Sequence, residues 1–248
     1  MSRSNTHENG SPNPAVRWFE WNGEKGLIRY YDKDAKQSVE VGSDFTFMLL
    51  DQLGSVRGWH DASESGIYSN EVKDTRQDVL VVKAFKGGTI AEGIYKDIKD
   101  RVNTEGGQFV ASCYIAFKGE DGALDIGNIR FKGAALREWM EFTKAHRADL
   151  YKKAVRINGS TEGKKGRVVF HVPVLSVKDI SADTNKAATA CDVVLQEFLA
   201  GYLKKNKRDQ AESVARHVSD EEVAGGYDDR VELPPDRAPA LTDDDIPF

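Results

Sequence analysis

The chain has 248 residues, of which 40% are apolar and 30% are charged. This composition is sufficient for a substantial buried core, either in one elaborated domain or in one domain with appendages. No run of about 18 apolar residues occurs, so we expect no membrane partner. The two cysteines, Cys113 and Cys191, form no CxxC motif and no disulfide framework, which predicts a protein of the reducing cytoplasm.

The net charge of −5 is distributed unevenly along the chain. Residues 209–248 carry a net charge of −9, from 12 acidic and 3 basic side chains, whereas residues 1–208 carry +4. The acidic segment has too few apolar residues to form a core. We predict a disordered lead-in at residues 1–15, a folded body at 16–206 and a disordered acidic tail at 207–248. Such a charge asymmetry indicates a nucleic-acid or basic partner.

Alternation of apolar and polar residues, typical of strands, dominates the chain up to about residue 132. Residues 16–21 and 27–32 flank a glycine-containing turn and predict a hairpin. The strongest hairpin pattern is QFVASCYIAFKGEDGALDIGNIRFKG at residues 108–133, where two β-rich runs surround a Gly-Glu-Asp-Gly turn. The other elements expected here are two strands and a short helix, at residues 45–53, 78–88 and 93–107.

The later part of the body mixes helices and strands. Residues 134–146 predict a helix, residues 166–177 predict a strand, and residues 183–205 predict a final amphipathic helix. Pro173 favours an edge or bulge position in its strand because proline has no backbone N–H to donate. The expected fold is mainly β with added helices: an OB-like Greek-key barrel followed by a C-terminal helix. Periodicity alone is equally compatible with another α+β sheet.

Catalytic signatures do not match the chain. The segment GSTEGKKG at residues 159–166 lacks the glycine spacing of a P-loop and the hydroxyl that follows its lysine. The five histidines show no metal-ligand spacing, and no GxSxG motif occurs. We therefore expect no enzymatic activity, no cofactor and no metal. Acidic-x-Lys triplets at residues 71–73, 97–99 and 162–164 keep a metal-dependent nuclease as an alternative.

Aromatic and basic residues occur together in several predicted strands. One face of the 108–133 hairpin is apolar, whereas the other carries an aromatic and several cations. Single-stranded nucleic acid is held by such pairs, because cations follow the phosphates while bases stack on exposed rings. Phe85 and Trp18 also fit core positions, and Tyr114 and Trp59 fit either role. The predicted DNA-binding residues are Arg57, Trp59, Lys83, Phe85, Lys86, Tyr114, Lys118, Arg130, Lys132, Lys164, Lys165 and Arg167.

The chain ends in TDDDIPF, at residues 242–248. A terminal Phe248 can fill an apolar pocket of a partner, and its α-carboxylate can meet an arginine at the rim. Three preceding carboxylates can steer this tip to a basic surface. The predicted partner-binding residues are Asp243, Asp244, Asp245, Ile246, Pro247 and Phe248.

The tip DDDIPF resembles the C-terminal end of bacterial single-stranded DNA-binding proteins, whose acidic tails recruit replication, recombination and repair enzymes. The longer body with added helices resembles phage-encoded members of that class. This resemblance implies an OB-fold body that coats single-stranded DNA. The match covers only the last six residues, so it assigns no stacking residue in the body.

These features predict a non-catalytic single-stranded DNA-binding protein in DNA replication, recombination or repair. If the protein is phage-encoded, its expected location is the cytoplasm of the bacterial host. Two alternatives remain beside it: an adaptor or decoy that binds host replication proteins without binding DNA, and the metal-dependent nuclease.

Overall fold

The computed structural model describes residues 12–221, with side chains through residue 208. The chain divides into two units, the first of which reaches Lys205. The architecture described below is that of the first unit.

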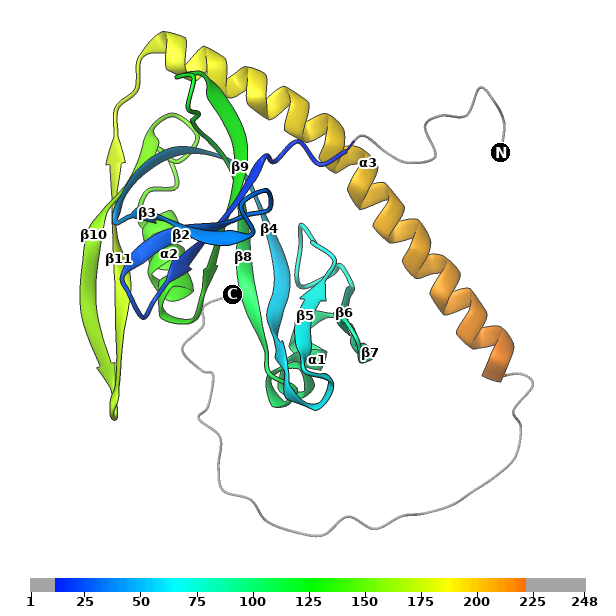
Figure 1. Cartoon of the computed structure of the whole chain (residues 1–248). Helices are drawn as coiled ribbons and strands as arrows, with labels where there is room; N and C mark the ends of the chain where they lie inside the picture. Colours follow the sequence, from blue (N-terminus) through cyan, green and yellow to red (C-terminus); the bar gives the residue numbers. More distant parts are fainter. Residues whose placement is uncertain (1–11, 222–248) are drawn as a thin grey trace. The chain divides into compact units, whose positions relative to one another are not determined.

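Eleven strands form one mixed sheet (Figure 1). The strands are β1 (Arg17–Asn22), β2 (Leu27–Asp32), β3 (Gln37–Gly42), β4 (Asp44–His60), β5 (Ser65–Ser69), β6 (Leu80–Ala84), β7 (Gly88–Gly93), β8 (Gly107–Lys118), β9 (Leu124–Lys132), β10 (Ala154–Lys165) and β11 (Val168–Lys178). The helices are α1 (Tyr95–Thr104), α2 (Gly133–Ala145) and α3 (Ala182–Glu221), and a short 3₁₀ turn, η1, covers Asp61–Ser63.

The strand order is β3-β2-β1-β9-β8-β4-β5-β6-β7, with β10 and β11 attached beside β4. All pairs are antiparallel except β1 with β9. Both predicted hairpins are confirmed, as β1–β2 and β8–β9. Pro173 lies in β11, which pairs only with β10 among the described strands. Pro173 itself is opposite Ser160, where the register of β10 shifts. Its predicted edge or bulge position is therefore also confirmed.

The mainly β class with added helices is confirmed, but the OB-like closed barrel is not. Within residues 12–221, β3 pairs only with β2 and β7 only with β6, so the sheet stays open. The long strand β4 explains this. Its first residues pair with β10 and its last residues with β5, so the neighbouring strands spread along its 17 residues instead of closing into a ring.

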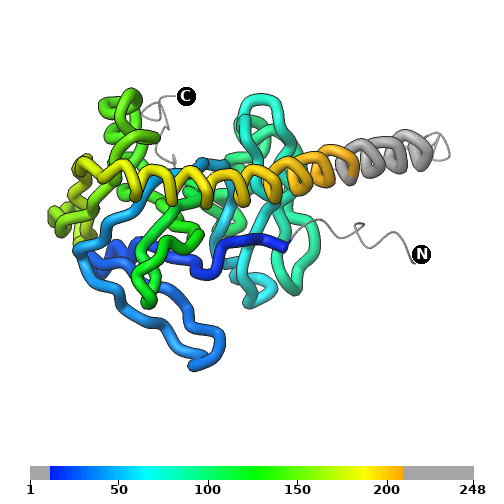
Figure 2. The backbone as a smooth tube through the Cα atoms, turned by 90° about the horizontal axis from the view of Figure 1, so that it is seen from above, coloured from blue at the N-terminus to red at the C-terminus, as the bar shows by residue number. Residues whose placement is uncertain are grey.

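Three apolar clusters hold the sheet and helices together. The largest contains Trp139 of α2, which is fully buried, stacks on Phe131 and donates a hydrogen bond from Nε1 to Gln52 at 2.8 Å. A second cluster packs α1 against β4 to β8. In the third cluster, Leu195 and Leu199 of α3 pack on the face of β4, β8 and β9 that is opposite to the first cluster. Figure 2 shows the yellow first half of α3 passing over the blue and green strands.

The boundaries of the body differ from the prediction at both ends. Asn13 donates a hydrogen bond to the hydroxyl of Tyr114 at 3.2 Å, and Ala15 packs against the third cluster, so the last residues of the predicted lead-in contact the body. The final helix, predicted to end near residue 205, continues to Glu221. Residues 1–11 and 222–248, including the DDDIPF tip, lie outside the described residues. In the described part, no helix is long and apolar enough to span a membrane.

Candidate nucleic-acid interface

Strands β4, β5 and β6 bring two rows of side chains onto one face of the sheet. Residues directly opposite each other in antiparallel strands point to the same face. In the first row, Arg57 pairs with Tyr68, and Tyr68 pairs with Lys83. In the second row, Trp59 pairs with Gly66, and the carbonyl of Gly66 accepts a hydrogen bond from the N–H of Phe85 at 3.0 Å. We call these six residues the aromatic face: Arg57, Trp59, Gly66, Tyr68, Lys83 and Phe85.

The aromatic face points to solvent because the other face of the same strands forms the second apolar cluster, which includes Ile67 and Ala84. The exposed fractions of Trp59, Tyr68 and Phe85 are 56%, 41% and 79%. A core position for Phe85 or Trp59, left open by the sequence, is therefore wrong. Large aromatic side chains that are exposed together mark a binding surface more often than a structural one.

Hydrogen bonds fix the backbone that carries these rings. The N–H of Trp59 donates to the carbonyl of Gly106 at 3.3 Å, next to the end of α1. The ring of His60 lies between Glu105 and Ser63, with Nε2 at 3.0 Å from Oε2 and Nδ1 at 2.6 Å from Oγ. The end of β4 is thereby tied to α1 and η1, which holds the ring of Trp59 on a defined support.

Cations surround the exposed rings. The side chains of Lys83 and Lys86 are exposed, and Arg57 is half-buried at the edge of the face. Burial lowers the pKa of Arg57, and the nearby carboxylate of Glu71 opposes that shift. Lys132 lies across β8 from Ser55, which is two residues from Arg57 along β4. Four of the predicted cations therefore lie on or beside the aromatic face.

Tyr114 is fully buried, so its predicted outward placement is wrong. Its hydroxyl donates to Oε2 of Glu71 at 2.8 Å, and Ser112 donates to the other carboxylate oxygen. The N–H of Glu71 donates to the hydroxyl of Tyr202 of α3 at 2.8 Å, so α3 covers this part of the sheet. Burial raises the pKa of Tyr114, and the charge of Glu71 raises it further, which keeps the phenol neutral.

Arg130 is mostly buried as well, against the prediction that it faces solvent. Its guanidinium carbon lies 4.5 Å from the ring centre of Trp18, a cation–π contact. Burial, followed by repulsion from Arg57, lowers its pKa to about 10, so it is still charged at neutral pH. Glu71 therefore lies close enough to both arginines to act on them electrostatically. Asn128 donates from Nδ2 to the hydroxyl of Ser112 at 2.8 Å. We call the buried Glu71, Ser112, Tyr114 and Asn128, together with the partly buried Arg57 and Arg130, the buried polar cluster.

The remaining predicted cations lie far from the aromatic face. Lys118 is exposed at the end of β8, ten residues from the partner of Arg57, which corresponds to about 34 Å of strand. Lys164, Lys165 and Arg167 lie at the exposed tip of the β10–β11 hairpin and not in a free loop. This hairpin joins the first residues of β4, whereas β5 joins the last, and Figure 1 shows the hairpin at the left and β5 to β7 at the right.

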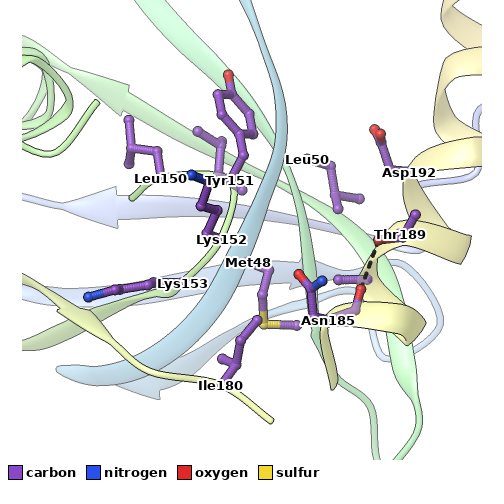
Figure 3. Close-up of a pocket in the computed structure, with 12 residues that line it drawn as sticks. Met48, Leu50, Leu150, Tyr151, Lys152, Lys153, Ile180, Asn185, Thr189 and Asp192 are labelled. Atoms are coloured by element: carbon purple, nitrogen blue, oxygen red, sulfur yellow. Dashed lines mark hydrogen bonds between the residues drawn. The ribbon is translucent and has the colours of Figure 1, made fainter. Parts of the chain in front are cut away.

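Two hollows of the described surface do not compete with the aromatic face as a nucleic-acid site. Figure 3 shows a pocket between β4, residues 150–153 and the start of α3, lined by Met48, Ile180 and Asp192 among others. Its volume is about 80 Å³, well below the roughly 300–1,000 Å³ of typical ligand sites. An open hollow of about 430 Å³ near the β8–β9 turn is lined by Glu120, Asp121 and Asp125. Its carboxylates would repel phosphate.

Sequence reasoning missed Gly66, Tyr68 and Glu71. Tyr68 alternates with the apolar Ile67, a signal of an outward position, but only the pairing with β4 and β6 places it beside Trp59 and Lys83. Among the side chains of residues 12–208, no group of three or more His, Cys, Asp or Glu is arranged to hold a metal. No family model, curated protein or solved structure matches the chain.

Proposed function

We propose that the body binds single-stranded DNA without catalysis and acts in replication, recombination or repair. The observation that carries this proposal is the aromatic face, where three exposed rings lie beside Arg57, Lys83 and Lys86 on an open surface. Base–aromatic stacking contributes about 1–3 kcal/mol per base, and cations add a salt-dependent attraction for phosphate.

The aromatic face suits unpaired bases better than a duplex. Bases within a duplex are stacked on one another, so their faces are not accessible to protein rings. An open sheet is sufficient for the task, because other sheet proteins stack two or three unpaired bases on exposed aromatics. The proposal therefore does not depend on an OB-type barrel, which the resemblance of the tip implies.

Titration of a labelled single strand and of a duplex of the same sequence, across a salt series, tests this function. We expect the single strand to bind at least about 10-fold more tightly, the worth of one stacked base. Three phosphate contacts should give a slope of log K against log salt of about −2. Equal binding to both nucleic acids would contradict stacking. The absence of binding at low salt would favour the adaptor or decoy, and magnesium-dependent cleavage would favour the nuclease.

The acidic tail is proposed to recruit replication, recombination or repair enzymes through Asp243 to Phe248. The carboxylates of the tail also compete with DNA for the cations of the body, since both are polyanions. Deleting residues 241–248 should therefore tighten oligonucleotide binding several-fold at low salt and abolish partner binding.

A Phe248→Ala variant is the matched control, because it keeps every carboxylate of the tail. It should lose partner binding while leaving DNA affinity unchanged, because only the apolar anchor is removed. Unchanged DNA affinity together with intact partner binding after the deletion would contradict both roles of the tail.

A further inference from the structure

Gly66 has no structural reason to be glycine. Its φ lies outside the left-handed region, and a Cβ added to it would meet no atom within 4 Å. Gly58, on the neighbouring strand, differs because a Cβ there would collide with the carbonyl oxygen of Gly106. Glycine inside a strand weakens it, since the backbone loses more entropy and no side chain packs. Gly66 thus leaves open space at a cost to the strand.

That open space lies between two aromatic residues. Trp59 is opposite Gly66 on β4, and the N–H of Phe85, which follows β6 on the other side, donates to the carbonyl of Gly66, so the strand register places both residues on the face of the missing side chain. Neither ring reaches within 4 Å of the Cβ position of Gly66. The large exposure of Trp59 and Phe85 agrees with rings that stand away from the sheet.

The spacing of the two rings suits one flat guest. Neighbouring strands lie about 4.8 Å apart, so the Cα atoms of Trp59 and Phe85 are separated by roughly 9.6 Å. A planar ring inserted between two others needs about 7 Å between the outer planes, or two carbon contacts of about 3.5 Å. A small inward lean of each ring provides that distance. An aromatic side chain at residue 66 would instead fill the space between the two rings.

The adjacent row supplies the charges that a nucleotide requires. Arg57 and Lys83 flank Tyr68, two residues along the strands from Trp59 and Gly66, which corresponds to about 7 Å. Phosphates on either side of an inserted base can reach these cations. A neutral aromatic guest would gain nothing from them, so the row favours a nucleotide within a strand.

We infer that Trp59 and Phe85 sandwich a single unpaired nucleobase above Gly66, while Arg57 and Lys83 hold the flanking phosphates. This inference rests on the proposed function and makes Gly66 a specificity-determining residue. Insertion requires a base that has left its stack and its pair. We call the space between Trp59 and Phe85 above Gly66 the slot. Because a paired base cannot enter the slot, the slot should disfavour duplex DNA more strongly than stacking on exposed rings alone would.

Gly66→Val tests the slot without changing a charge or an aromatic ring. We expect its affinity for a single-stranded oligonucleotide to fall at least 10-fold, because the valine occupies the place of the base. Gly66→Ala should give a smaller loss. The thermal midpoint of Gly66→Val should stay the same or rise, since valine favours strands. Gly201→Val is the matched control, because a Cβ at Gly201 also meets open space; it should bind as the unmodified chain does.

The outcomes separate the slot from the function. In a chain that already carries Trp59→Ala and Phe85→Ala, Gly66→Val should have no further effect, because the sandwich is already lost. Normal binding by Gly66→Val, with weakened binding by Trp59→Ala, would overturn the sandwich and leave the proposed function intact. Absence of oligonucleotide binding by the unmodified chain would overturn both.

Discussion

Replacing both Trp59 and Phe85 by alanine should weaken binding of a single-stranded oligonucleotide by about 100-fold or more. Stacking of a base on one ring contributes about 1–3 kcal/mol, so the two ring contacts of the sandwiched base contribute about twice that, and 1.4 kcal/mol corresponds to a tenfold change in Kd. Both side chains are exposed and lie outside the three apolar clusters, so the fold should be retained. Fluorescence anisotropy of a labelled oligonucleotide at fixed salt measures the change.

Tyr31→Ala provides the matched control for the loss of an exposed ring. Tyr31 is also largely exposed, but it lies on β2, several strands away from the aromatic face. Its replacement should leave the affinity unchanged. The account would be contradicted if the double variant bound as tightly as the Tyr31→Ala control, or if both weakened binding equally.

Glu71→Ala should lower the free energy of unfolding by about 3–5 kcal/mol. The carboxylate accepts hydrogen bonds from the hydroxyls of Ser112 and Tyr114 and counteracts the positive charges of the partly buried Arg57 and Arg130. Its removal leaves two hydroxyls without their acceptor, and it leaves two poorly solvated cations without the carboxylate that most favours their charged form. Buried hydroxyls without an acceptor and poorly solvated charges without compensation are strongly destabilising.

Urea-induced unfolding measures this effect, with Glu40→Ala as its control. Glu40 pairs with Lys25 in an exposed ion pair, and such pairs contribute only about 0–1 kcal/mol. Glu71→Gln should be intermediate, because it keeps one acceptor oxygen but loses the charge. A loss below about 1 kcal/mol for Glu71→Ala would show that the buried polar cluster is not electrostatically balanced by Glu71.

Local signals predicted the hairpins but not the length of β4. The β8–β9 turn has glycines at both ends and clear alternation on either side, so pairing partners are adjacent in sequence. Gly54 and Gly58 instead look like breaks after residue 53. In the structure they lie inside β4, where Phe109 and the backbone at Gly106 approach too closely for a Cβ. Glycine spacing therefore concealed a continuous strand whose length keeps the sheet open.

The candidate site was predicted in part for a similar reason. Alternation correctly assigned Tyr114 and Arg130 to one face of the β8–β9 hairpin, but it carries no information on what covers that face. Leu195 and Leu199 of α3, some 80 residues further along the chain, supply the cover. Trp59 and Phe85 were found individually, because each has a basic residue two positions before it. Their positions on either side of Gly66 became clear only from the register of β4, β5 and β6.

Photo-crosslinking tests most directly the central claim that unpaired bases contact the aromatic face. A single-stranded oligonucleotide containing 5-iodouracil would be bound to the full chain and irradiated, and the crosslinked peptides would be identified by mass spectrometry. We expect crosslinks at Trp59, Tyr68 or Phe85, and their loss when an excess of unlabelled single strand competes. Crosslinks confined to the tip of the β10–β11 hairpin, or to residues outside β4, β5 and the end of β6, would contradict the claim.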